Sequence, residues 1–118
     1  MHTAANLVTA LVALLHVYFL VLEMFLWTKP YGRRVFKLTE EKAQLTRTLA
    51  ANQGLYNGFL AAGLAWGLSL GADGYAIRTF FLGCVIIAGV FGAATVGRKI
   101  LYVQALPAAV ALALGCAA

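Results

Sequence analysis

The chain has 118 residues, which leaves room for one domain over 1–118. Only 11% of the residues are charged and 63% are hydrophobic. A soluble domain carries about a quarter charged residues, so this composition excludes an ordinary soluble protein. The net charge of +5 does not call for a nucleic-acid partner, because the positions of the basic residues fit a membrane protein better.

Four stretches contain no charged residue: 1–22, 48–72, 79–97 and 100–118. A helix needs about 20 mostly apolar residues to cross the hydrocarbon core of a bilayer, and each stretch has that length or nearly so. We therefore predict an all-α integral membrane protein, a bundle of four transmembrane helices over about 3–28, 40–70, 76–97 and 99–115.

The first predicted helix ends before Pro30, because a proline disfavours helix in the residue before it. No basic residue precedes this helix, and its apolar region is too long for a signal peptide. It is therefore expected to remain as an anchor. A short basic turn over 31–34 is expected to follow.

The second predicted helix begins after Thr39, a typical N-cap, with Glu40 and Glu41 favouring the positive end of the helix dipole. It is the longest helix and is expected to protrude on the inside. Residues 71–74 form a tight outer turn before the third helix. In the fourth helix, Pro107 leaves a backbone carbonyl without its donor and is expected to bend the helix.

Eight of the nine basic residues lie between the first and second spans or between the third and fourth. In a four-span protein these two connections share one side. Because short basic loops are retained in the cytoplasm, both termini are predicted outside, in a multi-pass protein of the cell (inner) membrane.

Small residues are frequent in the spans. The second helix carries Gly54 and Gly58 on one side and Gly63, Gly67 and Gly71 on another. Small residues let helices approach closely within the bilayer. Packing within the chain explains one such side, and we expect the other to form a homo-oligomer. The two cysteines, 84 and 116, have no partners at metal-ligand spacing, which predicts no metal site.

Polar residues inside the spans lie at a common depth. Glu23, a carboxylate within a span, lies about 9 Å inside the cytoplasmic end, and amides on the second and fourth helices begin at about 8 Å. Such residues generally face the protein interior and often mark functional sites. The predicted catalytic residues are Glu23 and Arg98, and the predicted ligand-binding residues are His16, Asn52, Gln53, Tyr56, Asn57, Tyr102 and Gln104.

A structural explanation for these residues stays open. The aromatic residues can anchor the helices at the membrane interface, and the amides can hydrogen-bond across helices. Glu23 can pair with Arg98 or Lys99, or stay protonated. His16 lies about 10 Å deeper than Glu23 on the same stripe of the helix, too far for a direct hydrogen bond.

Three runs resemble a family of small four-helix membrane proteins catalogued as a domain of unknown function: His16-Val-Tyr-Phe-Leu-Val-Leu-Glu-Met-Phe-Leu-Trp27, Leu49-Ala-Ala-Asn-Gln-Gly-Leu-Tyr-Asn-Gly58 and Gly97-Arg-Lys-Ile-Leu-Tyr-Val-Gln104. A looser similarity is to the membrane-associated eicosanoid and glutathione metabolism enzymes, through Glu23, Arg47, Asn52 and the Arg98-x3-Tyr102 pair. That similarity implies glutathione as a cofactor. The usual arginine-asparagine-glutamate spacing is absent, since Tyr56 and Asn57 stand where the glutamate is expected.

The sequence therefore predicts a cytoplasm-facing polar pocket that binds a small polar or amphipathic ligand. Two mechanisms stay open, as does a purely structural role. A relative of the glutathione transferases would activate a thiol with Arg98 or Tyr102. A proton-coupled transporter or channel would titrate Glu23 and His16 during turnover.

Overall fold

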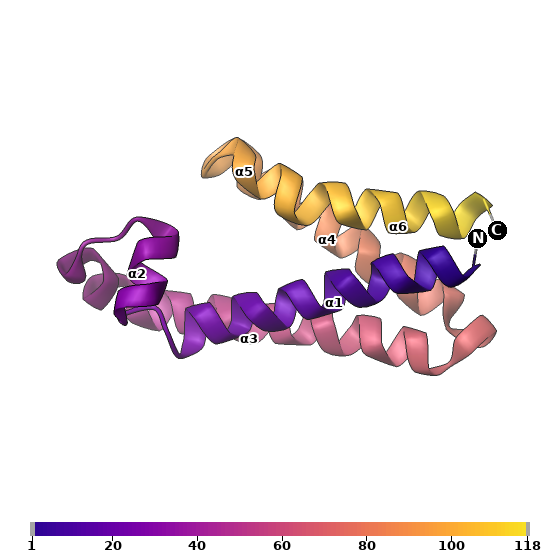
Figure 1. Ribbon diagram of the computed structural model, residues 1–118, viewed down its shortest axis with the longest axis horizontal. Helices are drawn as coiled ribbons and strands as arrows, with labels where there is room; N and C mark the ends of the chain where they lie inside the picture. The colour runs from indigo at the N-terminus through magenta and orange to yellow at the C-terminus, as the bar shows by residue number, and fades with distance from the viewer. Residues whose placement is uncertain (1, 118) are drawn as a thin grey trace. The chain divides into compact units, whose positions relative to one another are not determined.

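The computed structural model describes residues 2–117, and it contains helices and no strand within that range (Figure 1). The all-α class is therefore confirmed. In chain order the elements are α1 (His2–Met24), α2 (Pro30–Phe36), α3 (Glu40–Ser69), η1 (Gly71–Gly74), α4 (Tyr75–Thr95), α5 (Arg98–Ile100), η2 (Leu101–Ala105) and α6 (Leu106–Ala117).

Three helical segments are long and apolar enough to cross a membrane: His2–Met24, Gly71–Thr95 and Arg98–Cys116. The 30-residue α3 has the length but is less apolar. Its first turns carry Glu40, Glu41 and Lys42, and its middle carries the amides that the sequence placed in a span. The composition thus supports three crossings by length and hydropathy, and a crossing by α3 needs a separate argument.

The chain forms two compact units, 1–14 with 60–118 (unit 1) and 15–59 (unit 2). Both α1 and α3 extend through the boundary between the units. Each unit is described by itself below.

The core of unit 1 receives buried side chains from α1, α3, α4 and α6: Val12, Leu64, Leu82, Val85, Ala108 and Ala111. Small residues bring these helices together. A β-carbon at Gly89 of α4 would lie 2.7 Å from the backbone nitrogen of Ala105, and one at Gly63 of α3 would overlap the ring of Phe81.

Unit 1 also contains the end of α3. Gly71 has a φ of 59°, the left-handed conformation that commonly ends a helix. Arg78 of α4 donates hydrogen bonds of 2.7 Å to the carbonyl oxygens of Gly67 and Gly71. A cation at a helix C-terminus is favourable because the last carbonyls have no partner within the helix. Arg78 therefore caps α3.

In unit 2 the last turns of α1 pack closely on α3. A β-carbon at Gly54 would lie 3.2 Å from the carbonyl oxygen of Leu20, and one at Gly58 would lie 2.7 Å from a methyl group of the same leucine. The first helix ends at Met24, four residues before the predicted end.

The basic segment after α1 is a helix, α2, so the prediction of a short turn over 31–34 was wrong. Pro30 stands in its first turn, where a missing N–H costs nothing. The helix ends at Phe36, and the C-cap residue Lys37 has a φ of 55°. A β-carbon at Gly32 would collide with the carbonyl of Leu26, so this glycine lets α2 fold back on the end of α1.

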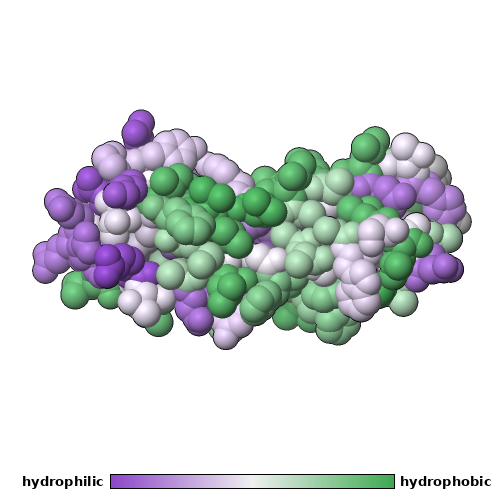
Figure 2. All heavy atoms as spheres, turned by 90° about the horizontal axis from the view of Figure 1, so that it is seen from below, coloured by the Kyte–Doolittle hydropathy of each residue, from purple (hydrophilic) through white to green (hydrophobic). Residues whose placement is uncertain are grey.

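Trp27 fixes the segment between α1 and α2. Its indole packs against Phe36 with ring centroids 4.7 Å apart and ring planes tilted by 44°, and its N–H donates to Thr46 at 2.9 Å. Hydrophilic side chains gather over α2 and the first turns of α3 (Figure 2). The basic residues of this region therefore share one end of unit 2.

The predicted fourth helix is divided. After α5 the backbone forms a π-helical segment, η2, and then continues as α6. Pro107 is the second residue of α6, so the irregular hydrogen bonding immediately precedes the proline.

Candidate functional site

The buried polar pair of unit 2 joins Glu23 of α1 to Asn57 of α3. The side-chain amide of Asn57 donates a hydrogen bond of 2.5 Å to Oε1 of Glu23. Asn57 is 4% exposed and Glu23 is half-buried. These two predicted site residues are therefore brought into direct contact.

The local packing explains why these two side chains meet. Gly54 lies about one helical turn before Asn57, and Gly58 directly follows it. Both glycines face α1. A β-carbon at Gly54 would lie 3.1 Å from Cβ of Glu23. Because both glycines lack a side chain, the helices approach closely enough for a short amide to reach the carboxyl group.

His16 lies seven residues before Glu23 on α1 and is fully buried. Its ring packs edge-on against Phe19, with centroids 5.3 Å apart. The sequence placed His16 and Glu23 on one stripe of the helix, and both turn inward in unit 2. Thr9, on the same stripe, is buried in unit 1 and bonds back to the carbonyl of Ala5 at 2.8 Å.

Three other predicted ligand-binding residues of α3 do not join the pair. Asn52, Gln53 and Tyr56 are exposed, and Tyr56 packs on Phe59 of the same helix. Because all three are exposed, they lie outside the buried contact that holds Asn57 against Glu23. The wider polar pocket stays a prediction.

The remaining predicted residues belong to unit 1. Arg98 of α5 and Tyr102 of η2 are exposed, and Gln104 of η2 is partly buried. Their role beside Glu23 stays a prediction, as does the role of glutathione.

Unit 2 holds two further polar contacts that the sequence did not suggest. The hydroxyl groups of Tyr18 and Tyr31 lie 2.6 Å apart and join α1 to α2. The bond from Trp27 to Thr46 joins the segment after α1 to α3. A tyrosine thirteen residues from another carries no recognisable spacing, so no sequence signal pointed to the first contact.

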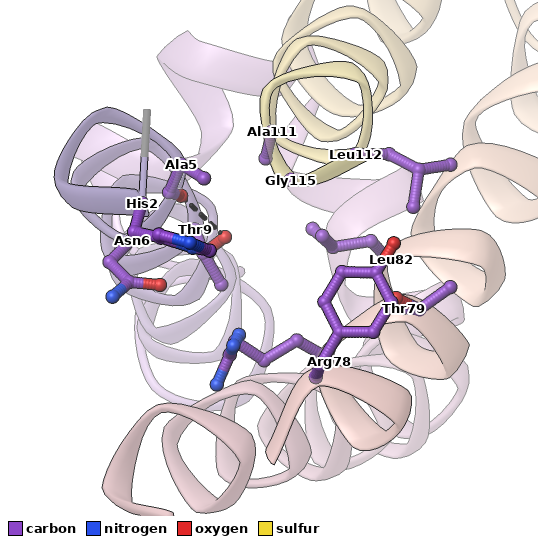
Figure 3. A pocket seen from close by; sticks show the side chains of 11 residues that line it. His2, Ala5, Asn6, Thr9, Arg78, Thr79, Leu82, Ala111, Leu112 and Gly115 are labelled. Carbon is purple, nitrogen blue, oxygen red and sulfur yellow. Dashed lines mark hydrogen bonds between the residues drawn. The ribbon is translucent and has the colours of Figure 1, made fainter. Parts of the chain in front are cut away.

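A second polar region lies in unit 1, where a small open pocket is lined by α1, α4 and α6 (Figure 3). His2 and Asn6 stand on one side of it, and Arg78 and Thr79 stand on the other. Its volume of about 20 Å³ is enough for a water molecule. Tyr75 also lines it and has its hydroxyl 3.5 Å from the thiol of Cys116. The sequence missed this pocket because its polar residues are scattered singly.

The Glu23–Asn57 pair is suited to hold a proton or a donor group. Both the carboxylate and the neutral acid present an acceptor oxygen to the Asn57 amide. The hydrogen bond therefore does not require either protonation state. Among residues 2–117, no group of three or more histidine, cysteine or acidic side chains could hold a metal ion.

The fold and the site thus define a small helical protein with apolar helices of membrane-spanning length and a carboxyl–amide pair between two helices. Residues 10–116 match the family model described as a protein of unknown function (DUF1304). The chain belongs to this family.

A relative supports the assignment. The chain is 31% identical over 100 residues to the uncharacterized protein YpaA of Lactococcus lactis subsp. lactis (strain IL1403), covering 83% of this chain and 84% of that protein. No solved structure matches the chain. These comparisons confirm the expected resemblance to a family of unknown function, and neither the family description nor the name of the relative states an activity.

Proposed function

We propose that this chain is a four-crossing membrane protein whose Glu23–Asn57 pair binds the donor or cationic group of a small polar or amphipathic ligand that enters from the cytoplasm. The observation that carries the proposal is the hydrogen bond between the Asn57 amide and the Glu23 carboxyl. A carboxyl group within an apolar span is costly and marks a functional site by default.

The fourth crossing follows from the packing of unit 2. Residues 54–58 of α3 lie against residues 20–24 of α1, which belong to an apolar span. The two helices therefore enter the bilayer together. With 30 residues, α3 is about 45 Å long, enough to cross and to extend beyond the hydrocarbon. Small residues and the buried Asn57 occupy its α1 face.

The orientation follows from charge. Basic residues of α2 and the first turns of α3 gather at one end of unit 2. Arg98 and Lys99 lie between the third and fourth spans, and in a four-crossing protein that connection is on the same side of the membrane as the one between the first and second. The positive-inside rule then places these segments in the cytoplasm. Glu23, at the end of α1 nearest α2, lies close to that side.

A thermal-stability comparison tests the ligand class. Hexylammonium carries a cationic donor on a short apolar tail, and hexanol has the tail without the charge. Hexylammonium should raise the Tm of the wild-type protein in detergent and leave that of Glu23→Gln unchanged, while hexanol should affect both alike. Equal responses of the two proteins to hexylammonium would contradict a cation-binding role for Glu23.

Proton-coupled transport is the second candidate, and the complete burial of His16 favours it. A buried imidazole two helical turns from a carboxyl group supplies a second proton-binding group in the same unit. In liposomes with an internal pH-sensitive dye, the wild-type protein would then carry protons, and both His16→Gln and Glu23→Gln would lose flux. A thiol-conjugation assay with glutathione separately tests the enzyme alternative, in which Arg98→Ala would lose activity.

A further inference from the structure

The face of α3 that points away from α1 carries an unpartnered heptad seam in unit 2. Successive members are four, three, four and three residues apart, the spacing of the a and d positions of a coiled coil. We call these residues the α3 seam: Leu45, Leu49, Asn52, Tyr56 and Phe59. All five are exposed, the two leucines by 77% and 73%.

The opposite face of α3 is occupied by the chain itself. Ala43, Ala50, Gly54 and Asn57 are buried, and the last two contact the end of α1. The α3 helix thus has one face committed to unit 2 and a second face, the α3 seam, that is covered by nothing within unit 2.

Contact with lipid acyl chains would explain why the leucines of the seam are exposed, but it would not explain the exposed side-chain amide of Asn52. Among the residues that the structure describes, no hydrogen bond reaches the side chain of Asn52 or of its neighbour Gln53. Acyl chains offer neither donors nor acceptors, so an unpaired amide at membrane depth costs several kcal/mol in order of magnitude. A protein surface with matching amides would remove this cost.

The glycine-rich sides of α3 are not free to serve instead. Gly54 and Gly58 approach α1 in unit 2, and Gly63 and Gly67 approach Phe81 and Arg78 of α4 in unit 1. Close approach through these glycines is used within the chain. An interface between copies that involves α3 is therefore expected on another of its surfaces.

We propose that the α3 seam binds the same seam of a second copy of this chain, with the Asn52 amides of the two copies hydrogen-bonded to each other. The proposal rests on the proposed membrane crossing of α3 and does not depend on the role of Glu23. Copies inserted in one membrane share an orientation, so their α3 helices are parallel and Asn52 meets Asn52 at the same depth.

The chemistry of the seam favours a second copy over another partner. A carboxamide has both donors and acceptors and is therefore complementary to itself. The five seam residues carry no charge, so two identical seams do not repel each other. A single asparagine among apolar a and d positions also fixes the register of such a pair.

Disulfide cross-linking in membranes tests the contact. In a background with Cys84→Ala and Cys116→Ala, single cysteines replace Leu49 or Tyr56 of the seam, and a control replaces Ile87 of α4, which is 72% exposed. Under mild oxidation the two seam cysteines should give disulfide-linked dimers and the control should not. Equal cross-linking at all three positions, or none at the seam, would overturn the proposal.

A matched pair of asparagine variants tests the amide itself. Asn52→Leu keeps the seam apolar but removes the hydrogen bond, and Asn6→Leu makes the same change at an exposed position of α1 in unit 1. Association in bilayers, measured by energy transfer between labelled copies, should be roughly three- to tenfold weaker for Asn52→Leu, the range of one interhelical hydrogen bond, and unchanged for Asn6→Leu. Unchanged association of Asn52→Leu would rule the seam out.

Labelling separates the failure of this proposal from that of the membrane crossing. In the cysteine-free background, Asn52→Cys is treated with a membrane-impermeant maleimide on intact and on opened cells. Protection in both supports the crossing, and absent cross-linking then refutes the seam alone. Ready labelling would refute the crossing and the seam together.

Discussion

A β-carbon at Gly54 would lie 3.2 Å from the carbonyl oxygen of Leu20, so α3 touches the backbone of α1 one turn from the Glu23–Asn57 hydrogen bond. Gly54→Ala should therefore push the helices apart and weaken that bond. The matched control is Gly83→Ala, since a β-carbon at Gly83 of α4 meets nothing within 4 Å. The control should gain up to about 1 kcal/mol from helix propensity. Thermal unfolding in detergent should place Gly54→Ala below the wild type and Gly83→Ala at or above it.

The coupling between Glu23 and Asn57 is measurable by a double-mutant cycle. Glu23→Leu and Asn57→Leu each remove one side of the hydrogen bond, and the double variant removes both. Interhelical hydrogen bonds in membranes contribute about 0.6 kcal/mol on average and up to about 1.7. The cycle, from unfolding free energies in mixed micelles, should give a coupling within that range. Additive effects would mean that the two side chains do not interact.

Glu23→Gln should fold as well as the wild type, because the glutamine carbonyl still accepts from Asn57. Its Tm should lie within a few degrees of the wild-type Tm, since replacing one acceptor by another leaves the hydrogen bond intact. Glu23→Leu serves as the control and should unfold at a lower temperature. A Glu23→Gln protein that fails to fold would show that the carboxyl group itself is structurally required.

Arg78→Gln removes the charged donor of two hydrogen bonds to the last turn of α3. A hydrogen bond to a charged group contributes about 1.5–3 kcal/mol, and the bond to Gly67 is partly buried while that to Gly71 is exposed, so this variant should be destabilised mainly through the first. Because the contact is local, hydrogen exchange should increase for the amides of 67–75 and stay unchanged in α2. A uniform increase would argue against a local cap.

Gly71 offers an independent probe of the same helix end. With a φ of 59°, it adopts a conformation that costs other residues about 1–2 kcal/mol. Gly71→Ala should therefore lower stability although a β-carbon there meets no neighbouring atom. Gly71→Asn should cost less than Gly71→Ala, because asparagine tolerates the left-handed region.

The sequence predicted the long helices because length and apolar composition depend on local residues alone. It also placed Glu23 near the depth at which the amides of the second helix begin, at Asn52, since helix rise converts residue number into distance. It did not separate Asn57 from Asn52 and Gln53, which needed the direction of each side chain around α3. The buried small residues of that face, such as Ala43, Ala50 and Gly54, were the signal that could have oriented the helix.

The helix α2 was missed for a different reason. A helix of seven residues has little intrinsic stability, and α2 depends on tertiary contacts such as Trp27 on Phe36 and Gly32 on Leu26. The sequence pattern around these residues does not predict those contacts. Likewise, the capping role of Arg78 depends on where α4 begins relative to the end of α3.

Solid-state NMR in lipid bilayers tests the central pair most directly. Protein with ¹³C at the glutamate carboxyl and ¹⁵N at the asparagine side-chain amide should show dipolar dephasing between the two labels, as expected at hydrogen-bond distance. The dephasing should disappear in Asn57→Leu and persist in Asn52→Leu. Absent dephasing in the wild-type protein, or dephasing that survives Asn57→Leu, would contradict the account.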